Sequence, residues 1–173
     1  MIILDETITV HVQPEDLMDF FAHIDKNYQA ISKDHIQVTC LQGHPLQEGS
    51  IFKNEEYFQG KPVQAKYIVK QVIPNKRIEY KALFPQSLIG GRLVNQIEAT
   101  NDGFVWTEII YLGFNTPLLG KLIDGLIRFL FVLLNGSVSD LKAHQTEGMK
   151  TVKHILEEKV QRREQSPVAA NVR

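Results

Sequence analysis

The fold is decided by the stretch from Thr116 to Val160, which reads TPLLGKLIDGLIRFLFVLLNGSVSDLKAHQTEGMKTVKHILEEKV. Its first part is apolar from Pro117 to Leu134, and a helical pattern restarts after an Asn-Gly pair and continues to Lys159. No other part of the 173-residue sequence carries so long a helical pattern, and residues 36–114 have the character of strands. The sequence therefore predicts an α+β fold, in which one long C-terminal helix covers a face of a single sheet.

The composition indicates one ordinary globular domain. Hydrophobic residues make up 43% of the chain and charged residues 23%, which is typical of a folded domain of this length. The net charge of −1 gives no reason to expect a nucleic-acid partner. We expect the domain to span residues 1–160 and a frayed tail to occupy residues 161–173, where the periodicity is lost.

Two features favour a cytoplasmic location. Cys40 is the only cysteine, so an internal disulfide and a thiolate metal cluster are excluded. The first residues turn acidic at once and lack the positive start of a signal peptide. The run 118–134 approaches membrane length, but it contains Lys121, Asp124 and Arg128. Each of these would cost ~3 kcal/mol at a bilayer centre, so we do not expect a transmembrane helix.

The remaining elements are read from alternation and turn residues. Residues 3–12 alternate as a half-buried strand, and short helices are expected near 14–24 and 28–32. Six further strands are expected at residues 36–41, 50–59, 62–73, 77–84, 92–100 and 104–114. The Asn-Asp-Gly run at 101–103 is the strongest hairpin signal in the chain. About seven strands in this order suit an antiparallel meander.

Several phrases of the sequence resemble a known family. They are Gly49-Ser50 at a strand start, Gly60 at a hairpin, the strand–turn–strand segment Val72–Ile78, and Leu141–Leu156 in the last helix. With the order of elements, they are similar to the START-like (SRPBCC) superfamily, near its polyketide cyclase/dehydrase branch. The resemblance covers roughly residues 3–160. The apolar insertion 117–136 departs from it, because it is longer than many members have before the last helix.

The resemblance implies a helix-grip fold, in which a curved antiparallel sheet wraps around a long C-terminal helix and encloses an apolar cavity. Members bind lipids, sterols, quinones, polyketides or plant hormones, and a few catalyse cyclisation or hydration. The superfamily has no universal catalytic motif, so the resemblance assigns no catalytic residue here.

Alternation along the strands and spacing along the last helix predict which residues face the cavity. One strand face carries Trp106, Glu108 and Ile110, and polar groups on other strands could each offer a hydrogen bond in an apolar pocket. Gly148 lies in the helix stripe, where a missing side chain could leave room for a ligand or allow close backbone packing. The predicted cavity residues are Tyr67, Tyr80, Phe84, Asn95, Ile97, Trp106, Glu108, Ile110, Leu141, Gln145, Gly148 and Val152.

Glu108 is a weak candidate for a catalytic residue. A buried carboxylate is costly unless paired, so Glu108 could pair with Arg92 or lie at a wet ligand site with a raised pKa suited to acid–base work. A register shifted by one residue would instead place it in solvent. Sequence alone favours the solvent position, because register is unreliable from sequence.

The apolar segment 117–136 admits three interpretations. It could pack on its own sheet or on a second copy of the chain, form a lid over the cavity, or contact a membrane surface. As a lid, its gate residues would be Leu119, Leu122, Ile123, Leu126 and Ile127. Its glycines weaken the helix, which would suit a mobile element.

Motifs for other chemistry are missing from the sequence. No two of the six histidines have a metal-ligand spacing, and His144 and His154 project about 280° apart around a helix. No phosphate loop, dinucleotide motif or nucleophile elbow occurs, so no metal and no cofactor are expected. The sequence predicts binding of a hydrophobic or amphipathic small molecule. The alternatives are a cyclase or dehydratase using the same cavity, or a lipid-transfer or membrane-associated module.

Overall fold

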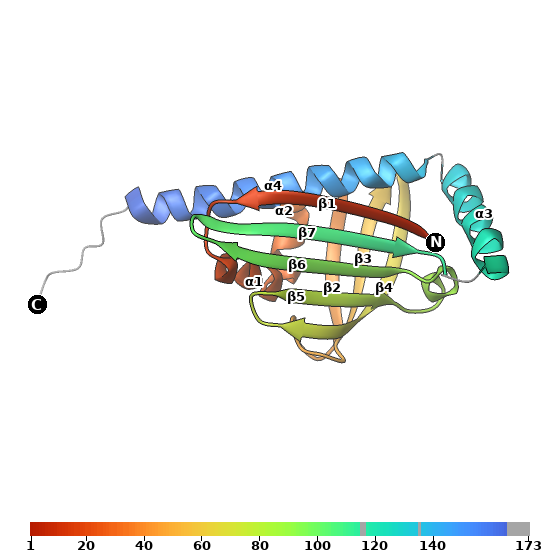
Figure 1. Ribbon diagram of the computed structural model, residues 1–173, viewed down its shortest axis with the longest axis horizontal. Helices are drawn as coiled ribbons and strands as arrows, with labels where there is room; N and C mark the ends of the chain where they lie inside the picture. The colour runs from red at the N-terminus through yellow and green to blue at the C-terminus, as the bar shows by residue number, and fades with distance from the viewer. Residues whose placement is uncertain (115–116, 135, 166–173) are drawn as a thin grey trace, which may run out of the picture.

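The computed structural model describes residues 1–114, 117–134 and 136–165. The elements follow the predicted order (Figure 1). They are β1 (Ile2–Val10), α1 (Pro14–Ala22), α2 (Ile24–Ile31), β2 (His35–Gln42), β3 (Ile51–Phe58), β4 (Lys61–Ile73), β5 (Arg77–Ala82), the short 3-10 helix η1 (Gln86–Ile89), β6 (Arg92–Thr100), β7 (Gly103–Leu112), α3 (Pro117–Leu133) and α4 (Val138–Gln165).

The strands form one antiparallel sheet in the order β1-β7-β6-β5-β4-β3-β2. Strands β2 to β7 are a meander, and β1 closes the order by pairing with β7. The sheet curves, and α4 runs along its concave side (Figure 1). The predicted α+β helix-grip fold is confirmed.

Some boundaries differ from the predictions. The break between the two short helices falls at His23, and β5 ends at Ala82, before the predicted end of that strand. The last helix continues to Gln165, past the predicted domain boundary at residue 160. The rest of the predicted tail, residues 166–173, lies outside the described residues.

The core fills one end of the space between sheet and helix. Leu17 and Phe20 of α1 are buried there against Ile97 and Trp106 of the sheet and Leu156 of α4. The inward-facing residues of the alternating strands form the sheet side of this core. The apolar side of α1 fills the space that remains between the sheet and α4. This end of the molecule is solid.

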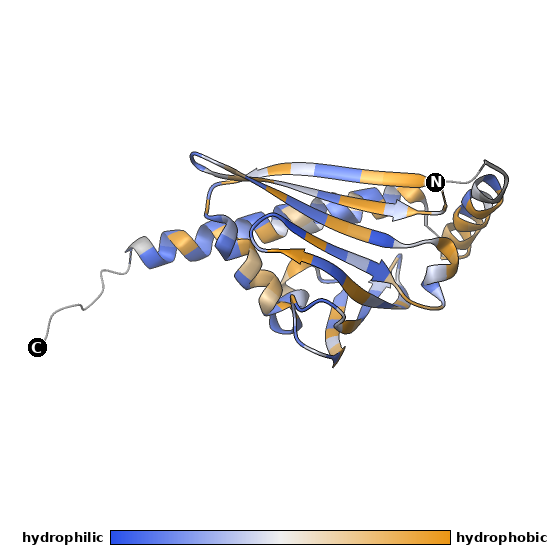
Figure 2. Ribbon diagram, turned by 60° about the horizontal axis from the view of Figure 1, so that its bottom comes forward, coloured by the Kyte–Doolittle hydropathy of each residue, from blue (hydrophilic) through white to orange (hydrophobic). Residues whose placement is uncertain are grey.

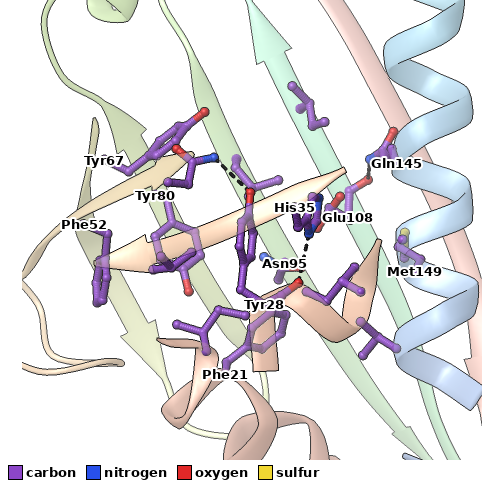
Figure 3. Close-up of a pocket in the computed structure, with 18 of the residues that line it drawn as sticks. Phe21, Tyr28, His35, Phe52, Tyr67, Tyr80, Asn95, Glu108, Gln145 and Met149 are labelled. Carbon is purple, nitrogen blue, oxygen red and sulfur yellow. Dashed lines mark hydrogen bonds between the residues drawn. The ribbon is translucent and has the colours of Figure 1, made fainter. Parts of the chain in front are cut away.

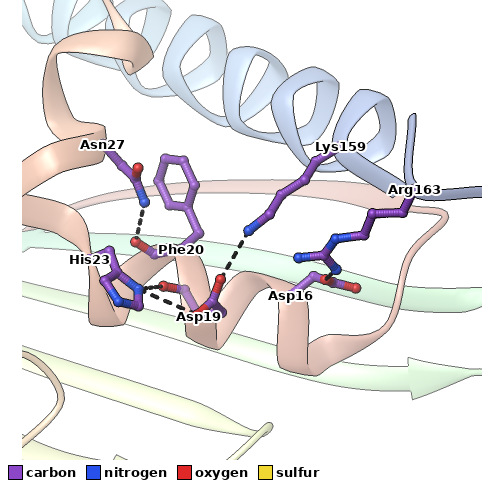
Figure 4. A network of polar contacts seen from close by, with 7 residues as sticks. All are labelled: Asp16, Asp19, Phe20, His23, Asn27, Lys159 and Arg163. Carbon is purple, nitrogen blue, oxygen red and sulfur yellow. Dashed lines mark hydrogen bonds and ion pairs between the residues drawn. The ribbon is translucent and has the colours of Figure 1, made fainter. Parts of the chain in front are cut away.

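Ion pairs hold the C-terminal half of α4 beside α1 (Figure 4). Lys159 Nζ lies 3.0 Å from Asp19 Oδ2, and Arg163 Nη1 lies 3.1 Å from Asp16 Oδ1. The hydrogen bond from Lys159 holds the pKa of Asp19 below its ordinary value. Because these pairs are largely exposed, they set the position of the helix end more than they stabilise the fold.

Helix α3 lies at the end of the sheet and packs by one face only (Figure 1). Ile127 is buried, Phe131 packs edge-on against Phe58, and Asp124 accepts a hydrogen bond from the amine of Met1 at 2.8 Å. Most residues of α3 are hydrophobic (Figure 2), and large apolar side chains outside the packed face are exposed. They are Leu122, Leu126, Phe129, Leu130, Val132 and Leu133.

Among the described residues, no single helix is long and apolar enough to cross a membrane. Only α3 and α4 taken together meet such a length and composition, and the chain bends by 74° between them.

The solid end of the core predicts a contrast between two leucines. Leu17 is fully buried and Leu122 is 71% exposed. We expect Leu17→Ala to lower the free energy of unfolding by ~3 kcal/mol, because it removes packed methyl groups and leaves a cavity. Leu122→Ala should change it by less than ~0.5 kcal/mol. Urea unfolding followed by circular dichroism measures both, and equal losses would contradict this account of the core.

Candidate functional site

A cavity of about 320 Å³ lies between the sheet, α2 and the N-terminal half of α4. Its wall is mainly apolar, and strands of the sheet, α2 and α4 also contribute polar side chains to it (Figure 3). The polar residues in the wall are Tyr28, His35, Asn54, Glu56, Tyr67, Tyr80, Arg92, Asn95, Glu108, His144 and Gln145. The apolar ones include Phe21, Ile24, Ile31, Val38, Phe52, Leu93, Trp106, Ile110, Leu112, Leu141, Met149 and Val152.

Most of the residues expected at the cavity from sequence line it. These are Tyr67, Tyr80, Asn95, Trp106, Glu108, Ile110, Leu141, Gln145, Gly148 and Val152. A Cβ built on Gly148 would meet only Ile31 Cγ2, at 3.4 Å, so the glycine both borders the open space and lies at contact distance from α2. That these side chains bind a ligand stays a prediction.

Phe84 and Ile97 lie elsewhere. Phe84 is 71% exposed, because β5 ends at Ala82 and the alternation that assigned it to the cavity stops there. Ile97 is on the expected sheet face, two residues from Asn95, but α1 covers that part of the face and makes it core. Sequence periodicity identified the face and could not show where α1 would lie.

The expected gate residues do not line the cavity. Ile127 is buried at the end of the sheet, and Leu122 and Leu126 point away from the protein. Ile123 lies in α3 outside the cavity wall, and the side chain of Leu119 lies outside the described residues. A gating role would require α3 to move and stays a prediction.

Glu108 belongs to the cavity wall. Strand register pairs it with Asn95 of β6 and places it on the face that α4 covers, so the solvent position that sequence alone favours is wrong. Burial raises the pKa of Glu108 to about 7, although the Gln145 amide and the charge of Lys142 partly oppose this rise. Its expected partner Arg92 lies instead near Glu79, at 3.7 Å, and over the ring of Tyr111.

Two buried amides have orientations that their partners determine. The indole Nε1 of Trp106 donates to Asn95 Oδ1 at 2.8 Å, and Gln145 Nε2 donates to the backbone carbonyl of Glu108 at 2.9 Å. An indole can only donate and a carbonyl can only accept, so neither amide can be turned around. This leaves Asn95 Nδ2 as a donor and Gln145 Oε1 as an acceptor, both buried and without a hydrogen-bond partner among the described residues.

Two tyrosines add hydroxyl groups to the wall (Figure 3). Burial raises the pKa of Tyr67 and of Tyr80, and nearby Glu56 and Glu108 raise them further. Both phenols therefore stay protonated at neutral pH, and they can donate hydrogen bonds but cannot act as bases.

A second polar cluster joins His35 of β2, Glu56 of β3 and His144 of α4. The two Nε2 atoms are 3.1 Å apart, and Glu56 Oε2 lies 3.5 Å from His35 Nε2. Burial lowers the pKa of His35. Sequence analysis missed this cluster because its members are far apart in the chain and no spacing rule connects them. Strand alternation at His35 and Glu56 was the only available signal.

Comparison with known proteins places the fold. No family model and no curated protein matches the chain. Solved structures do match, among them the ginseng major latex-like protein 151 from Panax ginseng, with a TM-score of 0.65 and 8% identity over 88% of this chain and 95% of that one. Ara h 8.0201 matches with a TM-score of 0.60 and 12% identity over 91% and 98%.

A third match is the di-domain ARO/CYC StfQ from the steffimycin biosynthetic pathway. Its TM-score is 0.64 and its identity 16%, over 91% of this chain and 51% of that one. With the cavity under the long helix, these matches define a helix-grip protein. At these identities the matches show the fold alone, and it is the helix-grip fold that the sequence resemblance implied.

The raised pKa of Glu108 predicts a pH dependence of stability. Between its ordinary pKa of 4.5 and about 7, Glu108 ionises in the unfolded chain but stays protonated in the fold. Its stabilising contribution is therefore complete below about pH 4.5 and is lost as the pH rises through about 7. From about pH 5 to about pH 8, wild type should lose ~2–3 kcal/mol relative to Glu108→Gln, as measured by urea unfolding. Parallel pH curves for the two proteins would show that Glu108 ionises normally.

Proposed function

We propose that this protein binds one amphipathic small molecule in the cavity beneath α4. The observation that carries the proposal is the pair of oriented amides, Asn95 and Gln145, which belong to the cavity wall and each have one buried polar atom without a hydrogen-bond partner among the described residues. A buried polar atom without a partner costs ~1–3 kcal/mol, which a ligand group in the right place would recover. The cavity volume of about 320 Å³ is at the lower end of the range of small-molecule sites.

The distribution of polar atoms favours a compact, ring-shaped ligand over a long acyl chain. Asn95 Nδ2 can donate to a carbonyl oxygen, and Gln145 Oε1 and Asn54 Oδ1 can accept from hydroxyl groups. Aromatic walls from Trp106 and Phe21 suit a flat apolar body. A polyketide-like or quinone-like compound carries both kinds of group, and the similarity to an ARO/CYC from a biosynthetic pathway supports this class.

A second candidate function is catalysis in the same cavity by a cyclase or dehydratase. Glu108 favours it, because a carboxyl group with a pKa of about 7 is present in both protonation states near neutral pH. Such a group can accept a proton from a carbon next to a ligand carbonyl and return it to an oxygen. The neutral phenol of Tyr80, whose pKa the Glu108 charge raises, could donate a hydrogen bond to the developing oxyanion.

We also propose that α3 contacts an anionic membrane surface. Leu122, Leu126, Phe129 and Leu133 follow a helical stripe and are all exposed. The exposed cations Lys121 and Arg128 lie on the flank of this stripe, as in helices that lie in a membrane interface. Contact with a lipid surface would support delivery of a hydrophobic ligand, as expected of a lipid-transfer module.

Ligand binding is tested by filling the cavity. Gly148→Phe would direct a ring into the open space beneath α4, so we expect it to weaken binding of 2-naphthol at least ~10-fold, as measured by isothermal titration calorimetry. Gly125→Phe is the matched control, because a Cβ at Gly125 meets nothing within 4 Å and α3 lies outside the cavity wall. Gly148→Ala should keep binding and raise the free energy of unfolding by up to ~1 kcal/mol. Equal binding by both phenylalanine variants would contradict the proposed location.

Membrane contact is tested by flotation with vesicles of phosphatidylcholine and phosphatidylserine. Leu126→Asp should abolish flotation, because it places a charge in the centre of the apolar stripe. Gln161→Asp, an exposed position on α4, makes the same change of charge away from α3 and should float like wild type. If wild type stays in the lipid-free fraction and sediments as a dimer that Leu126→Asp dissociates, the stripe contacts a second copy of the chain instead.

A further inference from the structure

Three potential metal ligands meet at the cavity wall. His35 comes from β2, Glu56 from β3 and His144 from α4, and all three border the cavity. His35 Nε2, His144 Nε2 and Glu56 Oε2 form a triangle with sides of 3.1, 3.5 and 4.0 Å. Elements that are distant in the sequence therefore direct two imidazoles and a carboxylate at one point.

The size of the triangle suits a metal ion. Its three corners lie on a circle with a radius of about 2.1 Å, which is the distance at which Zn²⁺ binds imidazole nitrogen and carboxylate oxygen. One ion could thus contact all three atoms without displacement of the backbone. With three protein ligands, such an ion would keep a further coordination position for a water molecule or a ligand oxygen.

Neighbouring groups already orient the ligands. His35 Nδ1 lies 3.1 Å from the backbone carbonyl of Tyr28, which can only accept, so Nδ1 carries the proton and Nε2 offers a lone pair. The ring of Tyr28 stacks on His35 at 4.0 Å, and its hydroxyl donates to Glu56 Oε2 at 2.8 Å. Such outer hydrogen bonds are the usual support of metal ligands in proteins.

The negative charge of Glu56 is not balanced by a lysine or an arginine among the described residues. Among the ion pairs of the described residues, Glu56 is approached only by the two imidazoles. The two facing Nε2 atoms have room for one proton between them. A divalent cation would neutralise the carboxylate and use the lone pairs of both histidines.

We propose that His35, Glu56 and His144 bind a divalent transition metal ion of the Zn²⁺ type, with an open coordination position facing the cavity. Two imidazoles and one carboxylate are a ligand set that Zn²⁺ and Fe²⁺ share in enzymes. When bound, the ion would polarise a carbonyl or hydroxyl oxygen of a molecule in the cavity. The proposal does not depend on the small-molecule proposal, because the metal site can be measured without a ligand.

The test titrates ZnCl₂ into the full chain after removal of metals with EDTA, by isothermal titration calorimetry, and records the visible spectrum with Co²⁺. We expect one ion per chain, and we expect the visible Co²⁺ spectrum to be that of a four- or five-coordinate site. His144→Ala and Glu56→Gln should each weaken Zn²⁺ binding ~100-fold or more, since they remove a ligand. Tyr28→Phe, which keeps the stacked ring and removes the hydroxyl, should weaken it ~10-fold.

His154→Ala is the matched control, because His154 lies on the same helix, is largely exposed and pairs with Glu158. It should bind Zn²⁺ like wild type. Circular dichroism verifies the fold of each variant. If His144→Ala fails to fold, Zn²⁺ binding by Glu56→Gln tests the proposal. Zn²⁺ binding that is unchanged in Glu56→Gln, or absent from wild type, would overturn the proposal and leave the cluster as a hydrogen-bonded triad only.

Discussion

The structure depends on one constraint, which is that a single straight helix must cover a curved sheet. Helix α4 has 28 residues and a length of about 42 Å at 1.5 Å per residue. A straight helix cannot stay in contact with a curved sheet along its whole length, so the space between them is solid only where another element fills it. Helix α1 does this at one end with Leu17 and Phe20. At the other end the curvature leaves the cavity.

Two buried amides in the cavity wall lower the stability of the fold, because each leaves one polar atom without a hydrogen bond in the described part of the chain. Asn95 is fully buried and Gln145 is 5% exposed, and each makes one hydrogen bond that holds it in place and leaves one atom unpaired. A protein selected for stability alone would replace such groups by apolar side chains of the same shape. Their presence in the wall is understood if the unpaired atoms meet a ligand.

Two chemically different groups of side chains line this cavity. Near β7 and α4, Glu108 is a carboxyl group whose pKa burial raises to about 7. Near β2 and β3, two imidazoles and Glu56 converge on one point, supported by Tyr28. An acid–base group and a metal ion bound by the three ligands, both in the wall of one cavity, would allow one bound molecule to be oriented and polarised.

The sequence by itself determined the class of fold, the order of elements, the hairpins and most of the cavity face. Alternation at Trp106, Glu108 and Ile110, and helical spacing from Leu141 to Val152, depend only on local geometry and can be read without the structure. Only the tertiary structure decided that Ile97 is core and Asn95 is cavity, because α1 covers one of them. It also decided the position of α3 and the meeting of His35, Glu56 and His144, since contacts between distant segments leave no periodic trace in one sequence.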